Sequence, residues 1–224
     1  MKIKSFTNTY KILVCVVLFV ALHTISFAHP PNISELNKAD VALLYAQLGF
    51  SHILPLGLDH ILFVLCLFLL NPKLKPILWQ ATAFTIAHTI TLGLAMYGVI
   101  KPPTNIVEPI IAISIMYVAL ENIFSPRLKA SRIGVVFVFG LIHGMGFASV
   151  LTELGLPQNS YLSSLLMFIL GVELGQVTVI LAAFLLLALP FGKKQYYRKY
   201  IVIPLSALIA LIAFYWTIER IFFT

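Results

Sequence analysis

The chain has 224 residues, of which 60% are hydrophobic and only 10% are charged, and its mean hydropathy is +1.00. Because soluble globular proteins carry about 25% charged residues, this composition excludes a soluble globule and predicts a polytopic membrane protein. The formal net charge of +7 does not indicate nucleic-acid binding, since the basic residues fall into short loops between apolar segments.

The first 28 residues are typical of a secretory signal peptide. Lys2, Lys4 and Lys11 accompany an apolar run over residues 12–22, and Ser26-Phe27-Ala28 has the small–x–small pattern of a cleavage site. The alternative is an uncleaved anchor. Either interpretation places the following segment on the outer side of the membrane.

Residues 29–51 are predicted to form an outer polar segment that ends in a short interfacial helix over residues 41–50. Six apolar segments follow within residues 52–224, and each predicts one transmembrane helix of an all-α bundle. The first reaches a spanning length only if the polar residues His52, Asp59 and His60 lie inside it. The segments cover roughly residues 52–70, 76–100, 105–124, 133–152, 162–190 and 201–222.

The basic residues of the loops predict the orientation of the bundle. With the mature N-terminus outside, nine Lys and Arg residues fall in inner loops and three in outer loops. This distribution satisfies the positive-inside rule with both termini outside. The inner residues are Lys73, Lys75, Arg127, Lys129, Arg132, Lys193, Lys194, Arg198 and Lys199, and the outer residues are Lys38, Lys101 and Arg220.

Ionisable side chains within the apolar segments are the candidate functional residues, because a charge inside a bilayer costs several kcal/mol unless it is paired or faces water. The helical rise places His88, His143 and Glu173 at one level, roughly 14–18 Å from the outer ends of their helices. Asp59 and His60 approach from the outer side of the first segment, and His52 at the start of that segment is a further candidate metal ligand. Together these side chains predict a cluster of imidazoles and carboxylates that opens outward.

Four further polar residues are assigned supporting roles. Glu108, just inside the outer face, is expected to guide an ion inward, and Glu121, Asn122 and Gln176 are expected to release it or relay protons. Each candidate also has a structural interpretation. Asp59 would cap a helix, His88 and His143 would bond to neighbouring helices within the core, and Glu108 and Glu121 would be interfacial residues.

Two glycine pairs lie beside candidate ligands. Gly140 and Gly144 flank His143, and Gly171 and Gly175 flank Glu173. The small-xxx-small spacing predicts that the backbones of neighbouring helices approach closely at these points. Close approach would bring the polar side chains of different helices within reach of one another.

Imidazoles combined with carboxylates suit a divalent transition metal such as nickel, zinc or cobalt better than magnesium or calcium, which prefer oxygen ligands alone. The chain has no G-x-S-x-G, H-E-x-x-H, C-x-x-C or phosphate-binding glycine motif. Two main hypotheses remain. The first is a permease for a divalent transition metal, and the alternative is an intramembrane hydrolase that uses the same cluster around zinc. A metal-binding assembly partner without transport is a third option.

Several motifs resemble the HupE/UreJ family of bacterial membrane proteins, whose members are usually described as nickel permeases. The resemblance runs through nearly all of the mature chain. The matching stretches are Gly49-Phe50-Ser51-His52, Asp59-His60-Ile61-Leu62-Phe63, Phe84-Thr85-Ile86-Ala87-His88-Thr89-Ile90-Thr91-Leu92, Glu108, Glu121-Asn122, Gly140-Leu141-Ile142-His143-Gly144-Met145-Gly146-Phe147-Ala148 and Gly171-Val172-Glu173-Leu174-Gly175-Gln176.

The resemblance implies that Asp59, His60 and His143 are metal ligands and that the protein lies in the inner membrane of a bacterium, with the lipid bilayer and a metal ion as its partners. Two departures identify a diverged branch. The six residues between His52 and Asp59 are one more than the nickel-permease pattern has, and no second histidine follows His143-Gly144.

Overall fold

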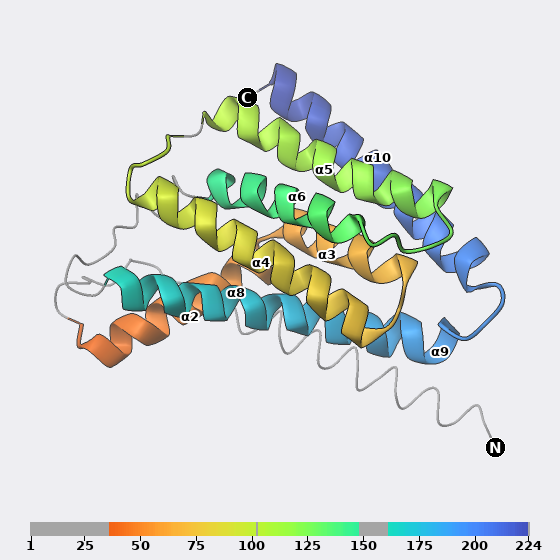
Figure 1. The fold of residues 1–224 in the computed structure, drawn as a ribbon, viewed down its shortest axis with the longest axis horizontal. Coiled ribbons are helices and arrows are strands. Elements are labelled where there is room, and N and C mark those ends of the chain that lie inside the picture. The colour runs from red at the N-terminus through yellow and green to blue at the C-terminus, as the bar shows by residue number, and fades with distance from the viewer. Residues whose placement is uncertain (1–35, 102, 148–160, 224) are drawn as a thin grey trace. The chain divides into compact units, whose positions relative to one another are not determined.

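The computed structural model describes residues 36–101, 103–147 and 161–223. The predicted signal peptide over residues 1–28 lies outside this part of the chain, as do residues 29–35 of the predicted outer segment. All regular elements of the described residues are helical, which confirms the predicted all-α class (Figure 1). They are α2 (Lys38–Ile53), α3 (Leu58–Leu70), α4 (Leu74–Met96), α5 (Thr104–Phe124), α6 (Arg132–Gly146), α8 (Tyr161–Ala183), the π-helical η3 (Phe184–Ala188), α9 (Leu189–Phe191), the π-helical η4 (Arg198–Val202) and α10 (Ile203–Phe222).

Four helical stretches in the described residues are long and apolar enough to cross a membrane. They are α4, α5, the run from α8 through α9 and the run from η4 through α10. The pair α2 and α3 passes the same test together, with a bend of 66° between its helices, and forms a fifth candidate span. The remaining predicted span, over residues 133–152, corresponds to α6, whose 15 residues make it shorter than the other candidate spans.

The first apolar segment differs from its prediction. Instead of an interfacial helix over residues 41–50 and a span that starts at residue 52, α2 continues to Ile53 and includes His52. Pro55 then disfavours a helical conformation at Leu54 and cannot donate a backbone hydrogen bond, so the helix ends before it. The sequence prediction assigned His52 to the same helix as His60, whereas the structure places the two on opposite sides of a break.

Helix α2 is also more deeply buried than an interfacial helix would be. Its residues Val41, Tyr45, Gly49 and Ile53 recur at four-residue intervals and form a buried face, which packs against α8. At its start, the side chain of Asn37 accepts hydrogen bonds from the backbone N–H groups of two first-turn residues at 2.9 Å.

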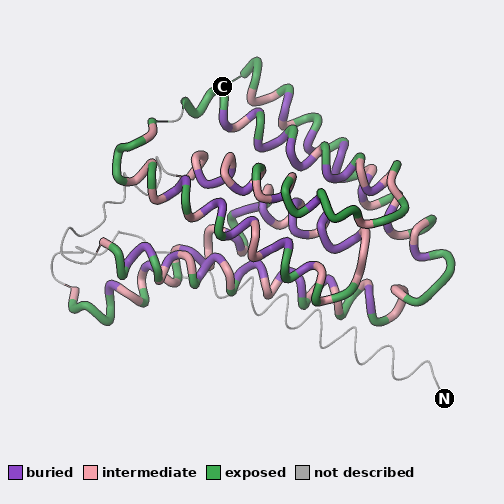
Figure 2. The backbone as a smooth tube through the Cα atoms, viewed as in Figure 1, coloured by how far each residue is buried: buried purple, intermediate pink, exposed green. Residues whose placement is uncertain are grey.

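Helix α3 lies at the centre of the bundle, where it contacts α2, α4, α5, α8 and α10. Its residues Phe63, Cys66, Leu67 and Phe68 are fully buried, and the purple tube of Figure 2 marks this core. The outward faces of the surrounding helices carry exposed apolar side chains such as Leu211. Such faces suit contact with lipid, since the lipid interior contains no water that could hydrogen-bond to polar groups.

The connections between helices gather at two ends of the bundle (Figure 1). The segments 71–73, 125–131 and 192–197 lie at one end, where Arg198 donates hydrogen bonds to the backbone oxygens of Ile123 and Ser125. This end holds all nine basic residues that the sequence assigns to inner loops. The segment 97–101, the start of α5 and the end of α10 lie at the opposite end.

The two predicted glycine pairs lie where helices meet. A Cβ atom on Gly144 would collide with the backbone oxygen of His88 on α4, and one on Gly171 would collide with the backbone oxygen of Ala46 on α2. The absence of side chains at these positions therefore sets the distance between α6 and α4 and between α8 and α2.

Gly171→Ala is expected to lower the stability of the protein in detergent by about 1–3 kcal/mol, because the added methyl group would force α8 away from α2. Thermal unfolding measures the loss. Gly93→Ala is the matched control, since its Cβ would meet only a Leu165 side-chain carbon at 3.8 Å. Equal melting temperatures for the two variants would contradict this explanation.

Candidate metal centre

Four imidazole rings from four different helices meet inside the bundle. His52 ends α2, His60 lies in the first turn of α3, and His88 and His143 belong to α4 and α6. The centroid of the His60 ring is 4.6 Å from that of His52, 5.3 Å from that of His143 and 5.6 Å from that of His88. The His52 and His88 centroids are 5.9 Å apart. We call these four side chains the imidazole cluster.

The backbone explains why these rings meet. The break between α2 and α3 turns the last turn of one helix toward the first turn of the next, which brings His52 against His60. Gly140 and Gly144 allow α6 to approach α4, so that His143 reaches the same region. His60, His88 and His143 are each at most 3% exposed.

Two of the rings are held by hydrogen bonds at Nδ1. The Nδ1 atom of His60 lies 3.1 Å from a carboxylate oxygen of Asp59, which also accepts the backbone N–H of His60 at 2.9 Å. The Nδ1 atom of His143 lies 2.8 Å from the backbone oxygen of Phe139. Because both partners are acceptors, Nδ1 carries the proton in each ring and Nε2 presents its lone pair.

Five ring nitrogens of the imidazole cluster are buried without any hydrogen-bond partner. They are Nε2 of His52, His60 and His143 and both nitrogens of His88. Buried polar atoms are normally hydrogen-bonded, because each unsatisfied one costs about 1–3 kcal/mol. The concentration of unsatisfied nitrogens in one place therefore indicates a site that a ligand with vacant coordination positions would complete.

The ring separations fit such a ligand. A tetrahedral transition-metal ion holds imidazole nitrogens at about 2.1 Å, which places the ring centroids about 5.2 Å apart. The observed separations of 4.6–5.9 Å span that value. Among the described residues, no three His, Cys, Asp or Glu side chains already stand in coordinating positions. Coordination therefore requires the rings to rotate out of their edge and tilted contacts until the nitrogens converge.

Hydrogen bonds of the kind that His60 and His143 make at Nδ1 orient metal-binding imidazoles and make the other nitrogen more basic. Asp59 thus has the position of a residue that supports His60. The hydrogen bonds to His60 use one carboxylate oxygen of Asp59, and direct metal binding by Asp59 stays a prediction.

A cavity of about 190 Å³ adjoins the imidazole cluster. Its walls include the candidate ligands His52, Asp59, His60 and His143, together with Glu108, Ile111, Gly146, Phe147 and Arg220. Arg220 donates a hydrogen bond to the backbone oxygen of Glu108 at 3.1 Å. The cavity thus joins the imidazole cluster to the start of α5 and the end of α10, at the end of the bundle that the sequence predicts to face outward.

Aromatic side chains close the remaining sides of the cluster. The ring of Phe147 lies 3.8 Å from that of His52, and the rings of Phe63 and Phe84 lie 5.2 Å and 4.9 Å from that of His143. These apolar rings lower the dielectric constant around the imidazoles and so strengthen electrostatic interactions inside the site.

Glu173 and Gln176 do not line this cavity. Glu173 lies on α8 and is partly exposed. Gln176 is buried one turn later, and its side-chain oxygen accepts a hydrogen bond from Thr85 at 3.2 Å. The structure thus places Gln176 between α8 and α4, where it links two helices.

Glu121 and Asn122 lie near the other end of the bundle, in a polar network that holds Arg132. The guanidinium donates to the Glu121 carboxylate at 2.9 Å, to the Asn122 side-chain oxygen at 3.0 Å and to the backbone oxygen of Cys66 at 3.3 Å. Asn122 in turn donates to Cys66 and to Ser206. This network ties α3, α5, α6 and α10 together.

Sequence reasoning missed the roles of Arg132 and the aromatic walls. Arg132 was counted as an inner-loop charge, but it is only 1% exposed. Its position directly before an apolar segment, eleven residues after Glu121, was the available signal. Phe84 precedes His88 by one helical turn, and this spacing predicts a shared face.

His88→Phe is expected to preserve or raise the thermal stability of the metal-free protein, because it removes two unsatisfied buried nitrogens while keeping a ring of similar shape. In contrast, a metal that stabilises the natural protein by about 2.7 kcal/mol at a hundredfold excess over its dissociation constant should stabilise the variant much less. Thermal unfolding with and without Ni²⁺, Co²⁺ or Zn²⁺ measures both effects. Undiminished metal stabilisation would exclude His88 as a ligand.

Asp59→Asn is expected to weaken metal affinity by about 10–100-fold, since the neutral amide no longer orients and polarises the His60 ring as a carboxylate does. Isothermal titration calorimetry of the purified protein measures the change. Asp40→Asn, an exposed substitution in the first turn of α2, serves as the control for loss of one carboxylate. An equally large loss of metal affinity in Asp40→Asn would show that the effect comes from the loss of a negative charge in general and not from the contact with His60.

The comparisons with known proteins agree with the motifs. A family model described as HupE / UreJ protein matches residues 28–220, which is most of the chain. Searches among curated proteins and among solved structures gave no match.

Proposed function

The chain belongs to the HupE/UreJ family, and we propose that it is a membrane permease for a divalent transition metal, with nickel, cobalt and zinc as the candidate ions. The observation that carries this proposal is the set of five unpartnered imidazole nitrogens on four helices. Neutral nitrogen ligands of this kind suit borderline first-row metals.

The cavity beside the imidazole cluster supports a route from outside. An ion would pass Glu108, whose carboxylate attracts cations, and would then exchange its water ligands for imidazole nitrogens. The Arg220 guanidinium lines the same cavity and adds a positive charge at its margin. Glu108 is therefore proposed to offset that charge while the ion approaches.

Release toward the other end requires the imidazoles to give up the ion. Protons compete with metals for ring nitrogens, so protonation of the cluster would weaken binding. We propose that protons move in exchange for the metal. The buried Arg132 and its partner Glu121 lie between the cluster and the inner loops, where the guanidinium opposes passage of a divalent cation until the network rearranges.

The same ligands suggested a zinc hydrolase as the alternative. That reaction needs a carboxylate to accept a proton from metal-bound water. Asp59 already accepts two hydrogen bonds from His60 at one oxygen, which suits a supporting role. Glu108 is a second carboxylate in the same cavity, and a flux experiment separates the two functions.

The distribution of charge supports an orientation. We propose that the end rich in basic residues faces the cytoplasm of a bacterium and that the protein lies in the inner membrane with both termini outside. The imidazole cluster and its cavity would then be reached from the periplasmic side.

Purified protein in liposomes is expected to carry Ni²⁺, Co²⁺, Zn²⁺ or Mn²⁺ inward, and faster when the liposome interior is more acidic than the outside, so that protons leave in exchange for the metal. His60→Ala should abolish transport, because His60 is the ring nearest to the other three. A metal-sensitive dye inside the liposomes measures the rate. Thr217→Val, which changes a buried α10 hydroxyl bonded to Ala213 of its own helix, should retain transport.

Absence of flux for all four ions, together with one zinc ion retained through purification, would overturn the permease and favour the hydrolase. Flux that persists in His60→Ala would place the transport route elsewhere in the bundle.

A further inference from the structure

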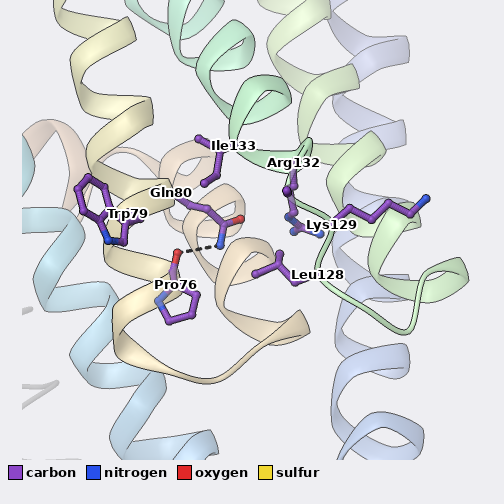
Figure 3. A pocket seen from close by; sticks show the side chains of 8 residues that line it. Pro76, Trp79, Gln80, Leu128, Lys129, Arg132 and Ile133 are labelled. Atoms are coloured by element: carbon purple, nitrogen blue, oxygen red, sulfur yellow. Dashed lines mark hydrogen bonds between the residues drawn. The ribbon is translucent and has the colours of Figure 1, made fainter.

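A second cavity lies at the opposite end of the bundle from the imidazole cluster. It measures about 300 Å³ and lies between the start of α4 and the segment that leads into α6. Its lining residues are Pro76, Trp79, Gln80, Leu128, Lys129, Ala130, Arg132 and Ile133 (Figure 3). We call it the inner cavity.

Two buried side chains of the inner cavity have unsatisfied atoms. Gln80 and Arg132 are each 1% exposed. The Gln80 amide nitrogen donates to the backbone oxygen of Pro76 at 3.1 Å, whereas its oxygen has no partner and is turned toward Arg132 in Figure 3. The terminal nitrogens of Arg132 are engaged, but its Nε–H has no acceptor. Two buried side chains that line the cavity therefore carry one acceptor and one donor without a partner.

The charge around the cavity favours an anionic group. Arg132 begins α6, and Ser131 before it provides no side-chain cap, so the positive end of the helix dipole lies at the cavity. Lys129 is exposed at the rim and points away from Gln80 in Figure 3. It therefore adds positive electrostatic potential near the cavity without a direct contact to a ligand inside it. Glu121 lies against Arg132 but does not line the cavity.

The size and walls of the cavity favour a ligand with apolar parts. Its volume corresponds to about ten water molecules, far more than two unsatisfied atoms require. Five of its eight lining residues are apolar: Pro76, Trp79, Leu128, Ala130 and Ile133. Trp79 is 63% exposed, and tryptophan is enriched where a membrane meets water. A soluble anion would lose hydration against these walls, whereas a lipid would place its apolar portion on them.

We propose that the inner cavity binds a phosphodiester headgroup that also carries a hydrogen-bond donor, as in phosphatidylethanolamine or phosphatidylglycerol. The phosphate accepts from Arg132 Nε, and the ammonium or hydroxyl group of the headgroup donates to the Gln80 oxygen. The glycerol backbone of the lipid lies along Trp79 and Ile133. The same phosphate chemistry is available from a soluble phosphodiester, and the test below separates the two sources.

Native mass spectrometry of the full chain in detergent, with added short-chain lipids, tests this site. Phosphatidylethanolamine and phosphatidylglycerol should bind about fivefold more tightly than phosphatidylcholine, because the choline headgroup has no N–H or O–H to donate to Gln80. Gln80→Leu should remove this preference. Gln80→Met provides a second variant of similar volume that also lacks the oxygen.

Filling the inner cavity with a larger side chain provides an independent test of lipid binding. Ile133→Trp should reduce binding of all three lipids, because the larger side chain fills the cavity. Val138→Trp is the matched control, an exposed position on the same helix that does not line the cavity. Equal losses in both variants, or equal affinity for all three headgroups in the unaltered chain, would overturn the proposal.

The source of the phosphate is tested by competition. Glycerophosphoethanolamine, which has the headgroup without acyl chains, should fail to displace the lipid at equal concentration. Displacement by this soluble ester would overturn the assignment to a lipid and identify the cavity as a site for a soluble phosphodiester.

Discussion

The cost of leaving a polar atom without a partner inside an apolar helix bundle governs this structure. Most buried polar side chains are satisfied by a nearby backbone oxygen, as Thr91 is by Leu141 and Thr217 by Ala213. The imidazole cluster departs from this pattern, because five of the eleven buried atoms without a partner in the described residues are its ring nitrogens. So many unpaired nitrogens in one place concentrate hydrogen-bonding capacity where a ligand can use it.

The imidazole cluster depends on backbone features that carry no charge. The break between α2 and α3 turns His52 toward His60, and the glycines of α6 let His143 approach the helix of His88. A side chain at Gly144 would press on the backbone of His88 itself. The positions of the four imidazole rings are therefore set by small residues and by a proline as much as by the histidines themselves.

The two ends of the bundle differ in the charged side chains that they carry. The end with the first cavity exposes a carboxylate and neutral imidazoles to an approaching ion. The other end encloses Arg132 among acceptors from three helices and holds most of the basic residues. In the proposed transport, Glu108 would offset the charge of Arg220 at one end, and the enclosed Arg132 would oppose a cation at the other.

Much of the fold and part of the site could be predicted from the sequence. Apolar segments of spanning length predict membrane helices because the backbone must satisfy its own hydrogen bonds in lipid, and a histidine or carboxylate in such a segment is conspicuous because its burial is costly. Those two rules identified the helices and all four residues of the imidazole cluster. They did not show that His52 ends a separate helix, that Asp59 holds the ring of His60, or that Arg132 is buried against Glu121. The apolar pattern of the sequence indicates only how deep in the membrane a residue lies. The direction of its side chain and the identity of its partner depend on how helices that are distant in sequence pack together, and only the tertiary structure decides that packing.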